Sequence, residues 1–137
     1  TFGHGVTYGG HPVGAAVALE CLEIYEEMNL PAHIARLGAR MDHHLSKIAE
    51  IAGVDQVRCQ GLLAGVEMAP STGSPSVSEQ VLNEARARGV FFRVIQDVIA
   101  IAPPYITSDQ DLDLIMTVLA DSIQHVVSAQ PLPMTAN

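Results

Sequence analysis

Apolar residues recur at helical spacing in two stretches near the start of the chain. The first runs from Pro12 to about Met28, and its apolar positions are Val13, Ala16, Val17, Cys21, Ile24, Tyr25 and Met28. Pro12 suits a first helical turn, where its missing N–H is not needed. The second follows a break at Asn29–Pro31, ends before Gly53, and contains Ile34, Leu37, Met41, Leu45, Ile48 and Ile51. The pattern predicts two consecutive amphipathic helices.

The middle of the chain favours short strands followed by a helix. Val54–Arg58 and Leu62–Met68 are rich in apolar and β-branched residues and are punctuated by glycines, which predicts two strands. Further on, Ser76 and Glu79 stand three apart ahead of an apolar-periodic segment. This spacing is typical of a capping box, in which each side chain bonds the backbone N–H of the other residue. A short helix is therefore predicted after Ser76, with Gly89 at its end.

The last third of the chain predicts a strand pair and a closing helix. The segment 90–106 is predicted to form two strands joined at Ile95–Asp97. Ser108 and Asp111 are predicted to begin a helix, and the tail from Gln130 is expected to be loose. The core-facing residues expected on this helix are Leu112, Ile115, Met116, Leu119, Ile123 and Val126. The predicted fold class is α+β, with an antiparallel or mixed sheet of short strands covered by helices.

Composition narrows the class of protein. The 137 residues are 48% hydrophobic with a mean hydropathy of +0.25, enough for one globular domain with a core. The net charge of -8 argues against nucleic acid or an anionic membrane as main partner, because both require a basic face. The sequence contains neither a run of about 20 apolar residues nor a signal peptide, so a cytoplasmic location is expected. Because the chain starts at Thr1 inside a glycine-rich stretch, we expect a fragment.

The glycine-rich stretch before the first helix could bind an anion. Glycines between Gly3 and Gly10 let the backbone approach a ligand at the positive end of a helix. The spacing matches neither the dinucleotide pattern GxGxxG nor a phosphate-binding GK[ST] loop. Thr7 could donate a hydrogen bond to a phosphate oxygen or simply belong to a structural turn, and its spacing leaves both open. His43 and His44 are adjacent on the second helix, so they point apart and do not predict a metal site.

Several segments resemble the class III aminotransferases, which are fold-type I pyridoxal phosphate enzymes. They are TFGHGVTYGGHPVGAAVALECLEIYEE, VRCQGLLAGVEMA, ARARGVFFRVIQDVIAIAPPYIT and DQDLDLIMTVLADSI. The resemblance covers nearly all of Thr1 to Val127 and is closest to the ω-transaminase or β-alanine (amine):pyruvate branch. It implies that residues 1–28 end the large domain with a phosphate-contacting turn and a linking helix. Residues 29–130 would then form the small C-terminal domain, and residues 131–137 a loose tail.

The resemblance also implies roles for three residues. Thr7 matches a threonine that reaches across a homodimer interface to the phosphate of the partner subunit's pyridoxal 5'-phosphate, and Val6 would lie at the mouth of that site. The dimer contact would run through the Gly3–Ala16 region. Arg93 matches a mobile arginine that pairs with a substrate carboxylate. The residues alone leave a second possibility, in which Arg93 points to solvent from an edge strand.

The sequence departs from the family pattern at two points. Where the family commonly has V-R-G-x-G, this chain has Cys59, which would have to take a backbone shape usual for glycine. The only lysine is Lys47, expected on the surface of the second helix, so the Schiff-base lysine would lie upstream. The resemblance implies a transaminase acting on an amine or amino acid and a keto acid such as pyruvate, with this fragment inactive alone. The alternative is a non-catalytic α+β module that binds a phosphate ligand.

Overall fold

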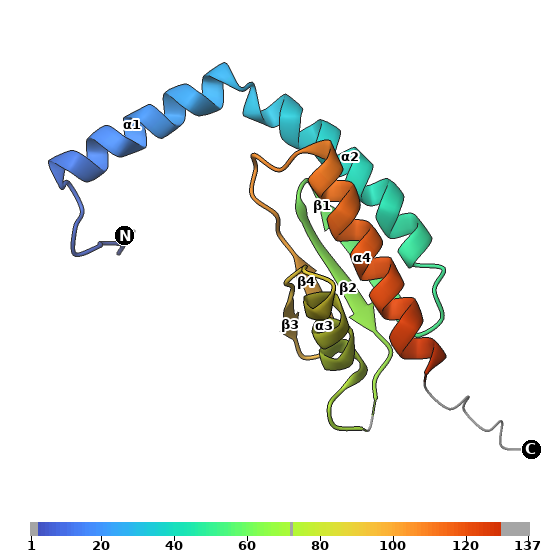
Figure 1. Cartoon of the computed structure of the whole chain (residues 1–137). Coiled ribbons are helices and arrows are strands. Elements are labelled where there is room, and N and C mark those ends of the chain that lie inside the picture. The colour runs from blue at the N-terminus through green and yellow to red at the C-terminus, as the bar shows by residue number, and fades with distance from the viewer. Residues whose placement is uncertain (1–2, 72, 130–137) are drawn as a thin grey trace, which may run out of the picture. The chain divides into compact units, whose positions relative to one another are not determined.

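The computed structural model describes residues 3–71 and 73–129, and these divide into two compact units between His33 and Ile34. The first unit contains two successive tight turns, helix α1 (Pro12–Glu27) and the beginning of α2 (Leu30–Ile48) (Figure 1). No residue of α1 is buried, and its apolar side chains are exposed. The predicted apolar helix therefore exists, but it buries none of its residues within the described part of the chain.

The second unit is an antiparallel sheet with helices. Its four strands lie in the order β1-β2-β4-β3, and every pair of neighbours is antiparallel. Its elements after α2 are β1 (Val54–Gln60), β2 (Leu63–Met68), α3 (Val77–Ala87), β3 (Arg93–Ile95), β4 (Val98–Ile101) and α4 (Asp109–Ser128) (Figure 1). The predicted α+β class is confirmed, and the sheet is antiparallel throughout.

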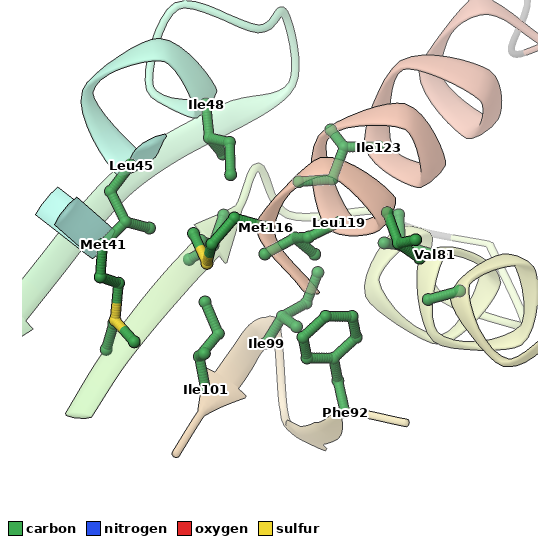
Figure 2. Packing of buried hydrophobic residues seen from close by; sticks show 14 of the residues in the cluster. Met41, Leu45, Ile48, Val81, Phe92, Ile99, Ile101, Met116, Leu119 and Ile123 are labelled. Carbon is green, nitrogen blue, oxygen red and sulfur yellow. The ribbon is translucent and has the colours of Figure 1, made fainter. Parts of the chain in front are cut away.

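The core lies on one face of this sheet. Alternate residues of β2, Ala64, Val66 and Met68, are buried, as period-2 alternation requires. Side chains from α2, α3 and α4 pack onto β4 and Phe92 in the same cluster (Figure 2). On α4 the residues predicted to face the core are buried, except the half-buried Ile115; the buried ones are Leu112, Met116, Leu119, Ile123 and Val126.

The opposite face of the sheet carries a row of residues that joins its two edges. Directly paired positions run from Arg58 on β1 through Gly65 and Ala100 to Arg93 on β3. Paired residues in antiparallel strands point to the same side, so two arginines flank two small residues. Arg58 donates to Glu67 over 2.7 Å. Arg93 is thus presented on the face of the sheet that lies away from the core.

Several predicted boundaries and one backbone shape are corrected. Helix α2 begins at Leu30, because Pro31 falls in the first turn, where a missing N–H is tolerated. Strand β3 begins only at Arg93, so the residues 90–92 precede the strand. Cys59 does not need a glycine-like conformation: it pairs with Ala64 in β1 as an ordinary strand residue. The positive φ of this region falls on Gly61, at 59°. The tail from Gln130 lies outside the described residues.

Among the described residues, no helix has the length and apolar character needed to cross a bilayer.

The turn between β3 and β4 contains a residue in the left-handed region. Gln96 has a φ of 56°, which L side chains rarely adopt. We expect Gln96→Gly to raise the free energy of unfolding by about 0.5–1 kcal/mol, because glycine takes this shape without steric cost. Urea unfolding of the two proteins measures the difference. A variant less stable than the parent would show that the glutamine side chain contributes more than its backbone conformation costs.

Ion pairs join α2 to the first turns of α4. Arg36 Nη1 lies 2.7 Å from Asp109 Oδ1, and His44 Nε2 lies 2.9 Å from Asp113 Oδ1. Arg40 Nε donates to the same Asp113 oxygen over 2.6 Å. These hydrogen bonds from Arg40 and His44 hold the pKa of the Asp113 carboxyl well below its usual range.

This depressed pKa predicts an acid dependence of stability. A carboxylate with a lowered folded-state pKa stabilises the fold above its ordinary pKa of about 3.9, and loses that contribution as the pH falls through the folded value. In Asp113→Asn the free energy of unfolding should therefore fall less steeply below about pH 4 than in the parent. Denaturant titrations at a series of acidic pH values measure both slopes. Equal slopes would show that Asp113 does not carry this dependence.

Candidate functional site

Two successive tight turns lead into α1. Gly9 N–H donates to Val6 O over 2.9 Å, and His11 N–H donates to Tyr8 O over 3.1 Å. A Cβ on Gly9 would lie 3.1 Å from Val6 O, so the first turn leaves little room for a side chain there. Gly10 has a φ of 79°. The backbone thus folds tightly around Thr7, whose side chain is exposed.

The turn has the features that a phosphate group requires. The Thr7 hydroxyl takes part in none of the hydrogen bonds that the structure gives for the described residues, and it can donate to an external oxygen. The turn leads directly into the N-terminal end of α1, where the helix dipole favours negative charge. His11 Nδ1 accepts from Gly14 N–H over 3.5 Å and caps the helix. Val6 is beside Thr7 and 65% exposed. These residues fit the phosphate end of a cofactor.

Arg93 is the arginine for which the described residues provide no partner. Most of the others are in ion pairs, namely Arg36, Arg40, Arg58 and Arg88. The guanidinium of Arg86 lies 4.9 Å from the ring centroid of Phe91. Arg93 is exposed on the edge strand β3, and its side chain takes part in none of the hydrogen bonds or ion pairs among residues 3–71 and 73–129. An edge-strand position agrees with both alternatives from the sequence, an arginine that binds a substrate carboxylate and one that points to solvent.

The surroundings of Arg93 favour a ligand. It lines an open pocket of about 550 Å³ whose apolar wall includes Phe91, Pro103 and Leu114. The acidic residue of this wall, Asp111, accepts a hydrogen bond from Ser108 Oγ at 2.7 Å and forms no ion pair with Arg93. A planar guanidinium suits a bidentate carboxylate, and the apolar residues beside it can contact the rest of the ligand. The pocket can therefore hold an organic acid with an apolar substituent.

Sequence reasoning named Arg93 but missed this pocket. Its walls come from three separate segments, and periodicity does not show which segments meet. One signal was available: Leu114 falls off the predicted core face of α4, and it is 57% exposed. A large apolar residue on the polar side of a helix often marks a contact or ligand surface.

The predicted site residues fall in different units. Val6 and Thr7 lie together in the first unit, and Arg93 lies in the second. Lys47 is exposed on α2, as predicted, and its side chain makes no hydrogen bond or ion pair with the described residues. Burial raises the pKa of the Cys59 thiol, which disfavours a reactive thiolate. Within the described ranges, no group of three or more metal-ligating side chains is assembled.

The chain is similar to known transaminases over most of its length. The family model for aminotransferase class-III matches residues 1–123. A probable gamma-aminobutyrate transaminase 2, mitochondrial, from Oryza sativa subsp. japonica is 35% identical over 130 residues, which are 90% of this chain and 26% of the relative.

Solved structures of transaminases are also similar to this chain. A PMP-bound aminotransferase from Vibrio fluvialis has a TM-score of 0.84 at 28% identity, covering 94% of this chain and 30% of that one. An omega transaminase from Pseudomonas jessenii, in complex with PMP, has a TM-score of 0.83 at 32% identity, covering 92% of this chain and 29% of that one. The chain thus spans between a quarter and a third of the length of these proteins.

Proposed function

This chain belongs to the class III aminotransferases, and we propose that it is the C-terminal part of a pyridoxal phosphate-dependent transaminase. The complete enzyme would move an amino group between an amine or amino acid and a keto acid such as pyruvate. The observation that carries this proposal beyond the family is Arg93, whose side chain has no partner among the described residues and which lines a largely apolar pocket. The similarity to an omega transaminase supports the ω-transaminase branch.

The phosphate of pyridoxal 5'-phosphate would lie at the turn before α1. The bound cofactor supplies an electron sink for chemistry at the carbon that bears the amino group. In this proposal the Thr7 hydroxyl donates to a phosphate oxygen of the cofactor held by a partner subunit, and Val6 lines the entrance. We place the homodimer contact in the Gly3–Ala16 region, and the exposed apolar side chains of Val6, Tyr8 and Val13 support a covered surface there.

The remaining parts of the active site would lie outside this chain. Lys47 is exposed on α2, and we assign it no role in catalysis. The Schiff-base lysine and the acid that pairs with the cofactor ring would belong to a preceding segment, and this fragment alone would be inactive. The division into residues 1–28, 29–130 and 131–137 is part of the same proposal. A cytoplasmic location stays a prediction from the sequence, since a relative from rice is named as mitochondrial.

Arg93 would bind the carboxylate of the acceptor. The guanidinium supplies two parallel N–H donors, which match the two carboxylate oxygens. Because Arg93 is exposed on an edge strand and makes no recorded ion pair among the described residues, no protein partner has to be broken first. The same lack of a partner would let the side chain turn away when an amine without a carboxylate binds.

A product assay on the complete protein tests the proposed reaction. With 1-phenylethylamine as donor we expect acetophenone to accumulate when pyruvate is added. A single turnover or less is expected when the acceptor is omitted. If pyruvate, glyoxylate and 2-oxoglutarate all fail to sustain turnover with amine and amino-acid donors, the proposed transaminase function is wrong.

The role of Thr7 predicts weaker cofactor retention in Thr7→Ala. Loss of one hydrogen bond to a charged phosphate should cost about 1–2 kcal/mol, or roughly 5- to 30-fold in the dissociation constant. Titration of the cofactor-free complete enzyme with pyridoxal phosphate, followed by absorbance, measures this constant. Thr117→Ala changes an exposed threonine on α4 and serves as the matched control. Equal affinities in Thr7→Ala and the control would remove Thr7 from the site.

A further inference from the structure

The strand that carries Arg93 has little support from the sheet itself. Strand β3 is 3 residues long and lies at the edge of the sheet, where β4 is its one neighbour. Three pairs join them, and the last is Ile95 with Val98. Phe92, directly before the strand, is buried in the core and fixes its beginning (Figure 2). The direction of the strand at Arg93 therefore depends on what holds its other end.

That other end is held by two hydrogen bonds from outside the hairpin. The turn consists of Gln96 and Asp97, and each backbone carbonyl accepts from a different element. Met68 N–H, at the end of β2, donates to Asp97 O over 2.9 Å. Ser78 Oγ, in the first turn of α3, donates to Gln96 O over 3.1 Å. Gln96 has a positive φ, which costs conformational energy for a residue with a side chain. The turn therefore depends on other contacts to keep its shape.

Ser78 is fully buried, so its hydroxyl needs a hydrogen-bond partner inside the protein. A buried hydroxyl is costly unless it is bonded. Its single proton goes to Gln96 O, so in the 3.0 Å contact between the two serine oxygens Ser76 is the donor. Ser76 Oγ in turn accepts from Glu79 N–H at 3.3 Å, as the N-cap of α3. The hydrogen bonds thus run in one direction from the cap of the helix to the turn.

The geometry points to Ser78 as a positioning residue for Arg93. By fixing Gln96 O, it holds the end of β3 and so the backbone position from which Arg93, a residue that lines the pocket, would reach a carboxylate. Ser78 touches neither substrate nor cofactor and acts through the strand. This inference rests on the proposed carboxylate role of Arg93 and extends it to a residue of a neighbouring helix. According to this inference, α3 contributes to the specificity for the keto acid acceptor.

The test uses the complete enzyme loaded with cofactor, with pyruvate and 1-phenylethylamine as probes. Ser78→Ala should lower kcat/KM for pyruvate about three- to tenfold, mainly through KM, as loss of one hydrogen bond predicts. For 1-phenylethylamine, which has no carboxylate, kcat/KM should stay within twofold. Ser122→Ala is the matched control, because Ser122 is equally buried but donates to Val118 O within its own helix. The control should leave both values within twofold.

A double-mutant cycle distinguishes an effect of Ser78 through Arg93 from a general loss of enzyme structure. In the Arg93→Ala background, Ser78→Ala should change kcat/KM for pyruvate less than twofold, because the group that it positions is gone. A full effect in that background, equal effects on both substrates, or no effect of Ser78→Ala on pyruvate would each overturn the inference. If Arg93→Ala itself leaves pyruvate unaffected, the proposed role of Arg93 fails first, and the inference fails with it.

A second variant covers the case in which Ser78→Ala does not fold. Ser78→Cys keeps a side chain of similar size and replaces the hydroxyl by a weak donor. It should show the same selective loss for pyruvate while circular dichroism shows that the protein is folded. Parental kinetics for both substrates in a folded Ser78→Cys enzyme would overturn the inference.

Discussion

Replacing Arg93 with alanine in the complete enzyme is expected to raise the KM for pyruvate about 10- to 100-fold. A bidentate hydrogen bond between charged groups contributes roughly 1.5–3 kcal/mol, and alanine removes it. Because 1-phenylethylamine has no carboxylate, its KM should stay within about twofold. Steady-state kinetics with each substrate varied separately give both values.

Arg58→Ala is the matched control for this experiment. Arg58 lies in the same row of the sheet at the opposite edge, but it is paired with Glu67. Its replacement should leave the KM for pyruvate within about twofold. An equal rise of KM for both substrates in Arg93→Ala would contradict the carboxylate role and favour an arginine that simply faces solvent.

Leu119→Ala is expected to have the largest effect on stability. Leu119 is fully buried on α4 and belongs to the cluster between the helices and the sheet (Figure 2). Truncation removes apolar burial and leaves a cavity, which together cost about 2–5 kcal/mol of the free energy of unfolding. Urea unfolding of the chain, followed by circular dichroism, measures the loss.

Leu114→Ala makes the same chemical change on the exposed side of the same helix. Leu114 is 57% exposed at the wall of the Arg93 pocket. Its truncation should change the free energy of unfolding by no more than about 0.5 kcal/mol. Similar losses in the two variants would contradict the placement of the core on one side of α4.

Most helices and strands could be predicted from the sequence because their capping residues and apolar spacing lie within the elements themselves. Ser76 and Glu79 form the predicted capping box, with both hydrogen bonds present. Ser108 caps α4, and its Oγ accepts from Asp111 N–H at 3.1 Å. The apolar spacing of α4 identified its buried face because periodicity directly reflects which side of a helix packs.

Other features depended on contacts that no local pattern contains. The sequence predicts a break at Asn29–Pro31, but α2 begins at Leu30 because a first helical turn tolerates Pro31. The family pattern predicts a glycine-like backbone at Cys59, but the positive φ falls two residues later, on Gly61. The pocket around Arg93 and the bond from Ser78 to Gln96 join segments distant in the sequence. Such partners emerge only when the chain is folded.

The sequence also does not predict what covers the apolar side chains of α1. Spacing predicted the helix correctly, but spacing does not say which surface will cover an apolar face. In the described residues no side chain of α1 is buried. The proposed homodimer contact in the Gly3–Ala16 region provides one such surface.

The most direct test of the central proposal is the intact mass of the source polypeptide after incubation with pyridoxal phosphate and reduction with borohydride. Reduction fixes the cofactor covalently to the lysine that holds it. We expect a mass well above 14.6 kDa that carries one adduct, mapped by peptide analysis to a lysine other than Lys47. A polypeptide of 14.6 kDa without a specific adduct would contradict the transaminase account and favour a module that binds a phosphate ligand without catalysis.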